Sequence, residues 1–199
     1  YEAVDQSDIY ERADAVSVKS RISLNTGRYN GVSFGLEVDN VYAVIDDYND
    51  TQNGLSDHPI VADPTGTDIN LAFFRHSTNN SRVVLGRQKI QHDNQRFVGN
   101  VGWRQNDQTF DGIRVQYKTK AFELDYSFIG NVNSVTGENV KGDFHLANVN
   151  HKINKHNEIS VFAYALDFQE NTSLSSTTYG VYYSGKFGPV VINATASTQ

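Results

Sequence analysis

Cysteine and methionine are both absent from this 199-residue chain, and proline occurs only three times. Without cysteine there is no disulfide framework, no thiolate metal site and no cysteine nucleophile. Because methionine is missing as well, we expect a processed or partial polypeptide. No apolar run reaches the ~18 residues that a transmembrane helix needs. A transmembrane barrel is not excluded, because its strands need only ~9–11 residues with every second one apolar.

Positive charge is also scarce. The formal net charge is −6, and no basic stripe of the kind found on nucleic-acid-binding proteins is present, so we expect no nucleic-acid partner. The aromatic content of 12% argues against disorder. We expect one domain over residues 1–199, since this length can bury a substantial core.

Apolar and polar residues alternate along most of the chain, and helical periodicity is almost absent. The pattern predicts strands with one consistently apolar face, which includes Phe162, Tyr164, Leu166 and Phe168 near the C-terminus. The opposite face is often charged. We expect it to line a lumen with Lys19, Arg21, Glu37, Asp39, Arg114, Lys118, Glu123 and Asp125.

The connections between strands give the fold class. Eleven strands are predicted, near residues 1–6, 15–26, 32–45, 68–77, 82–91, 111–119, 121–133, 143–153, 157–168, 178–186 and 190–198. Short turns alternate strictly with long loops, and the long ones span residues 7–14, 46–67, 92–110, 134–142 and 169–177. This pattern is typical of an all-β, antiparallel transmembrane β-barrel of the outer membrane. A soluble β-sandwich is the alternative, although its connections usually mix lengths.

An odd number of strands is unexpected, because single-chain bacterial barrels have an even number. We therefore expect the chain to be the N-terminal part of a larger barrel, incomplete at its C-terminus. A miscounted strand is the simpler alternative.

Residues with catalytic or metal-binding chemistry are scattered. The six histidines form no ligand spacing, and no nucleophile–base arrangement is recognisable, so we expect neither an enzyme nor a metal or other cofactor. Loop 46–67 gathers the oxygen-bearing residues Asp46, Asp47, Asn49, Asp50 and Asn53, but without EF-hand spacing. A solvated acidic loop is favoured there, with a cation site as the alternative.

The tight turn at 118–121 predicts two cross-strand pairs. A two-residue hairpin register places Lys118 beside Glu123 and Gln116 beside Asp125. Such pairs either hold neighbouring strands together or shape the electric field for a passing ion or sugar acid.

Three motifs stand within residues 84–112. They are Leu-Gly-Arg-Gln (85–88), Asp-Asn-Gln-Arg-Phe (93–97), and Gly-Trp-Arg-Gln-Asn (102–106) followed by Gln-Thr-Phe-Asp (108–111). Through them the segment resembles outer-membrane channels of the alginate-export type from Gram-negative bacteria. Weaker likeness covers residues 1–6, 61–70 and 173–180.

The resemblance implies a barrel of about 18 strands in the outer membrane. It also implies contact with lipid and lipopolysaccharide, and passive passage of anionic or carbohydrate-type solutes. Oligomeric state is left open. Candidates for an electropositive constriction that binds the solute are Arg87, Lys89, Arg96, Arg104 and Arg114, since guanidinium groups match carboxylates.

Aromatic residues accompany these cations. Trp103, Phe97 and Phe110 either stack on sugar rings or tether an infolded loop to the wall. Arg87 and Lys89 share the parity of Leu85, so a bulge is needed before both face the lumen.

The functional hypothesis is thus a non-catalytic channel. One alternative is a soluble carbohydrate-binding β-domain with Trp103 in its binding loop. Another is an outer-membrane protein acting mainly as a surface receptor or adhesin through its long loops.

Overall fold

The computed structural model describes residues 1–6 and 10–199. Within them, eleven strands and one short 3-10 segment, η1 (Thr172–Leu174), follow one another. The strands are β1 (Glu2–Val4), β2 (Ala13–Asn25), β3 (Val32–Asp47), β4 (Gly66–Ser77), β5 (Ser81–Gln88), β6 (Thr109–Lys118), β7 (Phe122–Asn133), β8 (Asn139–Asn154), β9 (Asn157–Phe168), β10 (Ser176–Phe187) and β11 (Val190–Thr198). No helix among these residues is long and apolar enough to cross a membrane.

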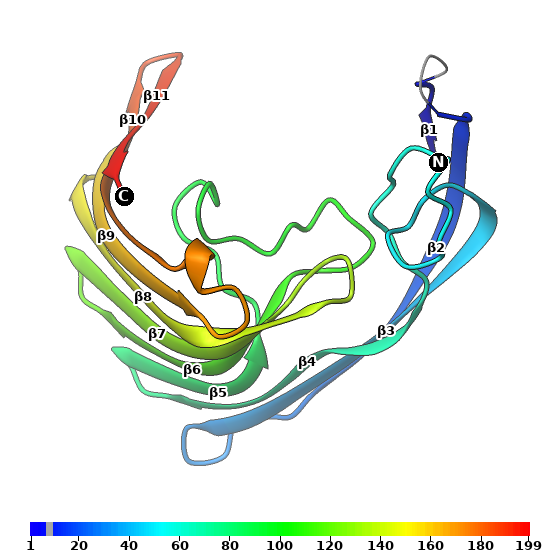
Figure 1. Ribbon diagram of the computed structural model, residues 1–199. Coiled ribbons are helices and arrows are strands. Elements are labelled where there is room, and N and C mark those ends of the chain that lie inside the picture. Colours follow the sequence, from blue (N-terminus) through cyan, green and yellow to red (C-terminus); the bar gives the residue numbers. More distant parts are fainter. Residues whose placement is uncertain (7–9) are drawn as a thin grey trace.

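Each strand pairs antiparallel with the next, so that one sheet runs in the order β1 to β11. The prediction of an all-β, eleven-stranded antiparallel fold is confirmed. Figure 1 shows the sheet bent into a trough, with β1 and β2 in one arm and β10 and β11 in the other. The described strands do not close into a complete barrel, since β1 and β11 pair only with β2 and β10.

The predicted alternation of short and long connections is present. Tight turns join β2 to β3, β4 to β5, β6 to β7, β8 to β9 and β10 to β11, so they all lie at one rim of the sheet. The other rim carries the long connections 48–65, 89–108, 134–138 and 169–175. Residues 7–9 of the loop predicted at 7–14 lie outside the described residues.

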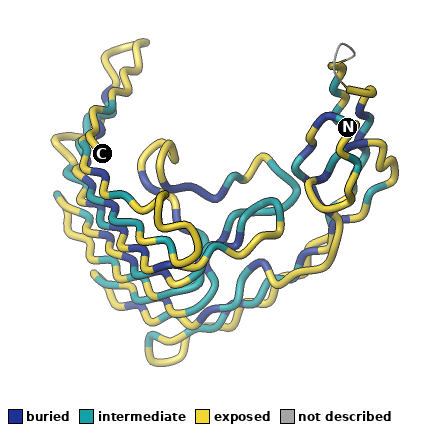
Figure 2. The backbone as a smooth tube through the Cα atoms, in the orientation of Figure 1, coloured by how far each residue is buried: buried dark blue, intermediate teal, exposed yellow. Residues whose placement is uncertain are grey.

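The outward face of the trough is apolar and exposed. Ile22, Phe74 and Leu85 are 78%, 60% and 58% exposed, and Leu124 and Val161 also lie on this face. Figure 2 shows exposed and less exposed residues alternating along β5 to β9. Alternate residues of each strand therefore lie on opposite faces of the sheet, and the apolar set faces away from the hollow of the trough.

One part of the face assignment is wrong. Phe162 and Tyr164 of β9 are each only 3% exposed and form a cluster with Phe144 and Leu146 of β8, whereas Val161, the residue before Phe162, is exposed. The cluster also contains Ile90 and Val98 from the connection between β5 and β6. These aromatic residues therefore line the hollow, because that connection folds in and removes them from water.

We call residues 89–108 the inner loop. Figure 1 shows it, in green, rising inside the hollow of the trough. Its turns are closed by backbone hydrogen bonds, for example from His92 N to Val98 O at 3.0 Å and from Gln108 N to Asn100 O at 2.8 Å. The backbone has positive φ at Asp93, Gln95 and Val101. Positive φ is unusual for a β-branched residue such as valine, so the surrounding contacts must hold this conformation.

Candidate functional site

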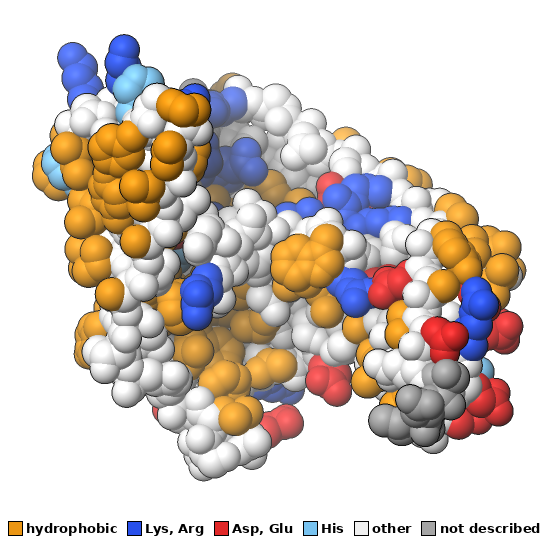
Figure 3. Space-filling view, turned by 90° about the horizontal axis from the view of Figure 1, so that it is seen from above, with side chains coloured by type: hydrophobic (Ala, Val, Ile, Leu, Met, Phe, Trp, Pro, Cys, Tyr) orange, Lys and Arg blue, Asp and Glu red, His pale blue; other side chains and the backbone are white. Residues whose placement is uncertain are grey.

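A group of charged side chains, together with one amide, fills the hollow between β2–β4 and the inner loop. We call it the ionic cluster, and its members are Lys19, Arg21, Glu37, Asp39, Asn70, Lys89 and Asp107. The wall strands supply the first five, and the two ends of the inner loop supply Lys89 and Asp107. Figure 3 shows blue basic and red acidic side chains next to one another inside the hollow.

Asp107 is the hub of this cluster. Its Oδ2 atom lies 2.5 Å from Arg21 Nη2, 2.8 Å from Lys89 Nζ and 3.7 Å from Lys19 Nζ. The Asn70 amide donates a further hydrogen bond to it at 2.9 Å. Only 6% of the Asp107 side chain is exposed. The C-terminal end of the inner loop is therefore attached to β2 and β4 through one carboxylate.

The members of the ionic cluster that lie on the wall strands also form short ion pairs with one another. Arg21 donates two hydrogen bonds to Asp39, from Nε at 2.7 Å and from Nη2 at 2.6 Å. Lys19 Nζ lies 3.1 Å from Asp39 Oδ2, and Arg21 Nε lies 3.2 Å from Glu37 Oε1. Two-point contacts of this kind fix the orientation of a guanidinium group as well as its charge.

Burial and charge act in opposite directions on Asp107. Burial alone would raise the pKa of this carboxyl group, but hydrogen bonds from Lys89 and Arg21 outweigh it and lower the pKa to about 2. Glu37, Asp39 and Asp107 bring carboxylate oxygens within 4.8 Å of one another. Three side-chain cations already contact these three acids, so the cluster is a balanced salt-bridge network.

A second group lies further along the wall, at the start of the inner loop. Arg114 of β6 forms a two-point ion pair with Asp125 of β7, and Gln116 donates to the same carboxylate at 2.8 Å. His92 of the inner loop lies 3.7 Å from Asp125 and 3.1 Å from the Tyr164 hydroxyl. The predicted pairing of Gln116 with Asp125 is therefore confirmed.

The other predicted pair is confirmed as well. Lys118 Nζ lies 2.8 Å from Glu123 Oε2, across the tight turn between β6 and β7. Both side chains are more exposed than those of the ionic cluster. This pair therefore contributes little to stability, as is usual for surface ion pairs.

The predicted constriction residues do not form one group. Arg87 pairs with Asp111 at 2.8 Å and donates to the backbone oxygen of Ile69 at 2.9 Å. No register shift interrupts the pairing of β5, so Arg87 keeps the parity of Leu85. Lys89 reaches the ionic cluster because β5 ends at Gln88, and the bulge that would be needed for both residues to face the lumen is absent from β5.

The remaining predicted residues belong to the inner loop. Arg104 lies 3.1 Å from Glu2 and 3.6 Å from Asp63, and so ties the loop to the N-terminal strand. Arg96 is exposed and has no ion pair within the described residues. Trp103 is 78% exposed and contacts no other ring in that part of the chain.

Phe97 and Phe110 favour tethering over sugar stacking. The Phe97 ring lies 5.2 Å from the Phe162 ring and 6.3 Å from the Tyr164 ring, measured between centroids. Phe110 is 5% exposed and belongs to the same apolar cluster. Phe97 of the inner loop therefore packs on the wall, and Phe110 of β6 belongs to the wall cluster that receives Ile90 and Val98. The inner loop is held by apolar contacts here and by ionic contacts at β2–β4.

Three residues of this site were not predicted from the sequence. Asp107 and Asn70 lie in polar stretches where no pattern distinguishes them. Arg75 of β4 faces the hollow like its buried neighbour Phe73, and its guanidinium stacks over the Phe73 ring at 4.6 Å. Within residues 1–6 and 10–199, Arg75 has no acidic partner, and its buried Nε atom has no hydrogen bond. The only sequence feature that could have placed Arg75 in the hollow is its position in the two-residue alternation of β4.

The acidic loop 46–67 uses its oxygens locally. Asp50 Oδ1 accepts hydrogen bonds from the backbone nitrogens of Gln52 and Asn53, both at 2.7 Å, and Asn49 Oδ1 accepts one from Thr51. Such contacts stabilise turns. The cation site considered for this loop stays a prediction.

A curved antiparallel meander with an apolar outward face, a charged hollow and an infolded loop defines the class of outer-membrane β-barrel proteins. Solved channels of this class from Pseudomonas aeruginosa share the fold. OccD3 (OpdP) matches with a TM-score of 0.67 and 16% identity over 94% of this chain and 44% of its own. OccK9 (OpdG) matches with 0.63 and 14% over 98% and 54%.

The sequence also matches the alginate export family over residues 10–183, and the chain belongs to that family. It is therefore a protein of the bacterial outer membrane. The chain spans about half the length of the solved channels that it matches. No curated protein matches it.

Proposed function

We propose that this chain forms part of the wall and the constriction of a non-catalytic outer-membrane channel. Small polar solutes, anionic or carbohydrate-type, pass through it passively. Further strands complete the barrel, and the outward apolar face contacts lipid and lipopolysaccharide. The observation that carries this proposal is the inner loop, which lies inside the hollow of the trough and is attached to the wall by the ionic cluster.

The charges of the hollow refine which groups attract an anion. Lys89, Arg104 and Arg114 each contact a carboxylate, and so does Arg87, which keeps the outward parity of Leu85. The fields of these four cations are therefore largely cancelled at a distance. Neighbouring acids and bases still offer many donors and acceptors, which suits solutes rich in hydroxyl groups. Net attraction of an anion rests on cations without an acidic partner.

Arg75 and Arg96 are such cations within the described residues. Arg75 faces the hollow from β4, and Arg96 lies at the exposed turn of the inner loop. We therefore assign anion preference to these two side chains, and structural bracing to the paired arginines. In this proposal the five cations considered as one electropositive constriction no longer share a single role.

Ion selectivity in planar bilayers tests this assignment. The full-length protein is inserted and the reversal potential is measured across a KCl gradient. Arg75→Gln and Arg96→Gln should each shift the potential towards cation preference. Lys155→Gln, in the tight turn between β8 and β9, serves as the matched control and should leave it unchanged. Reversal potentials that do not differ between wild type and both arginine variants would refute the assignment.

The soluble carbohydrate-binding alternative is not supported. Ile22, Phe74 and Leu85 expose large apolar side chains on one continuous face, which water would solvate unfavourably and lipid would not. The receptor or adhesin role of the long loops stays a prediction without a structural observation in its favour.

A further inference from the structure

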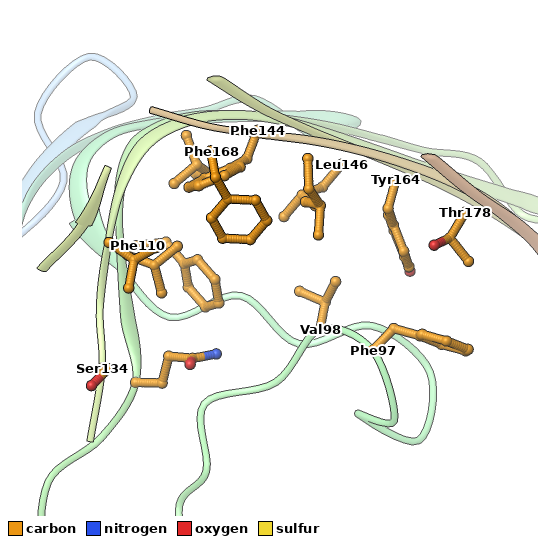
Figure 4. Close-up of a pocket in the computed structure, with 14 residues that line it drawn as sticks. Phe97, Val98, Phe110, Ser134, Phe144, Leu146, Tyr164, Phe168 and Thr178 are labelled. Carbon is orange, nitrogen blue, oxygen red and sulfur yellow. The ribbon is translucent and has the colours of Figure 1, made fainter. Parts of the chain in front are cut away.

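An apolar pocket lies beside the passage, between the inner loop and the wall strands β6 to β10. We call it the wall pocket; its volume is about 280 Å³. Figure 4 shows the rings of Phe168 and Phe110 reaching into it, with Tyr164 and Leu146 on the wall side. Val98 and Phe97 close it from the inner loop.

The lining of the wall pocket differs from the rest of the hollow. No Asp, Glu, Lys, Arg or His is among the residues that line it, although Lys89 and Asp107 at the two ends of the same loop belong to the ionic cluster. Its polar side chains are Gln108, Ser134 and Thr178. Figure 4 places Ser134 and Thr178 at opposite ends of the space. A water molecule in the middle would find few hydrogen-bonding partners there, so apolar contents are favoured.

Size and lining together specify what fits. An apolar cavity of ~150 Å³ accepts benzene, and pockets for small molecules begin at ~300 Å³. The wall pocket thus has room for one substituted ring. Phe97, Phe110, Phe144, Tyr164 and Phe168 offer ring faces and edges for aromatic contacts. A carboxylate would be buried without a cation, which is costly, so the ring must be uncharged.

We propose that the wall pocket binds a neutral monocyclic aromatic molecule of the phenol type. The ring lies among the phenylalanine side chains, and the hydroxyl group reaches Ser134 or Thr178 at one end. This site is separate from the path of polar solutes. Because Phe97 and Val98 belong to the inner loop, a bound ring stabilises the docked position of that loop.

Calorimetric titration of the full-length protein in lipid nanodiscs tests the proposal, with phenol and benzoate as matched probes. Phenol should bind saturably, with an affinity at least tenfold higher than that of benzoate at pH 7. Failure of phenol to bind, or equal binding of both probes, would overturn the proposal. The proposal is also overturned if phenol fails to bind because another segment of the full-length protein fills the pocket. The titration does not depend on whether the protein conducts.

Filling the pocket provides the second test. Val140→Phe and Val98→Phe place an extra ring in it from the wall and from the inner loop, and each should weaken phenol binding at least tenfold. Val161→Phe makes the same change on the outward face of β9 and should leave binding unchanged. Heat-modified electrophoretic mobility identifies variants that fold. Wild-type affinity in a folded filling variant would show that phenol binds elsewhere.

Bound phenol should also slow tryptic cleavage after Arg96, which lies beside Phe97 in the inner loop. Benzoate should not slow it at the same concentration. Equal cleavage rates with and without saturating phenol would contradict the link between the pocket and the docked loop.

Discussion

Replacing Asp107 by asparagine removes the carboxylate that attaches the inner loop to the wall. The pKa of Asp107 is about 2, compared with an ordinary value of 3.8, because Lys89 and Arg21 stabilise its charged form. That difference corresponds to about 2 kcal/mol in favour of the docked, ionised state. The ratio of docked to undocked loop should therefore decrease on the order of 30-fold. The variant also leaves three cations of the cluster facing two carboxylates.

Two measurements on the full-length protein at pH 7 follow the docked state. Single-channel currents of Asp107→Asn should show larger fluctuations than wild type, because the loop leaves the wall more often. Tryptic cleavage after Arg96 and Arg104 should accelerate by up to about 30-fold, since cleavage follows the population of the open form. Glu138→Gln, at the exposed loop between β7 and β8, is the matched control. If Asp107→Asn shows wild-type noise and wild-type cleavage, the ionic cluster does not hold the loop.

Three further outcomes are expected. Acid should release the inner loop of wild type: the stabilisation from Asp107 is complete above its unfolded pKa of 3.8 and is lost as the pH falls through about 2. Current noise measured at pH 7, pH 4 and pH 2 checks this, and a change completed above pH 4 would contradict it. Gly112→Ala should destabilise the fold by about 1–3 kcal/mol, because a Cβ atom there would lie 2.1 Å from Phe128 O. Gly130→Ala is the control, since a Cβ atom at that position meets no atom within 4 Å. Urea unfolding in lipid vesicles compares the two, and equal midpoints would refute the reasoning. Leu85→Arg should cost about 2–4 kcal/mol near the bilayer midplane, and an unchanged unfolding midpoint in vesicles would show that this face does not contact lipid.

Strand positions and their register near tight turns were predictable because they depend on neighbouring residues. Alternation placed β2 to β11 within a few residues of their observed ends. A two-residue turn was enough to pair Lys118 with Glu123 and Gln116 with Asp125. These are local effects, and the period of two repeats over each strand.

Contacts between distant segments were not predictable in the same way. Asp107 is 86 residues from Arg21, and nothing in the sequence around either residue indicates the other. Phe162 and Tyr164 alternate as lipid-facing residues would, yet they are buried by the inner loop. The sharp turns of that loop occur at Asp93, Gln95 and Val101, whereas its glycines have no positive φ. In each case the conformation depends on tertiary contacts that override local preference.

The two attachments of the inner loop differ in physical character, and so they respond to different conditions. Dissolved salt screens the partly exposed ion pairs of Lys19, Arg21 and Lys89, while the apolar contacts of Ile90 and Val98 are insensitive to screening. Cooling weakens the apolar attachment, because hydrophobic stabilisation decreases at low temperature. A high salt concentration would thus weaken the attachment of the loop to β2–β4, and a low temperature would weaken its attachment to β8–β9. The docked position of the inner loop therefore depends on both ionic strength and temperature.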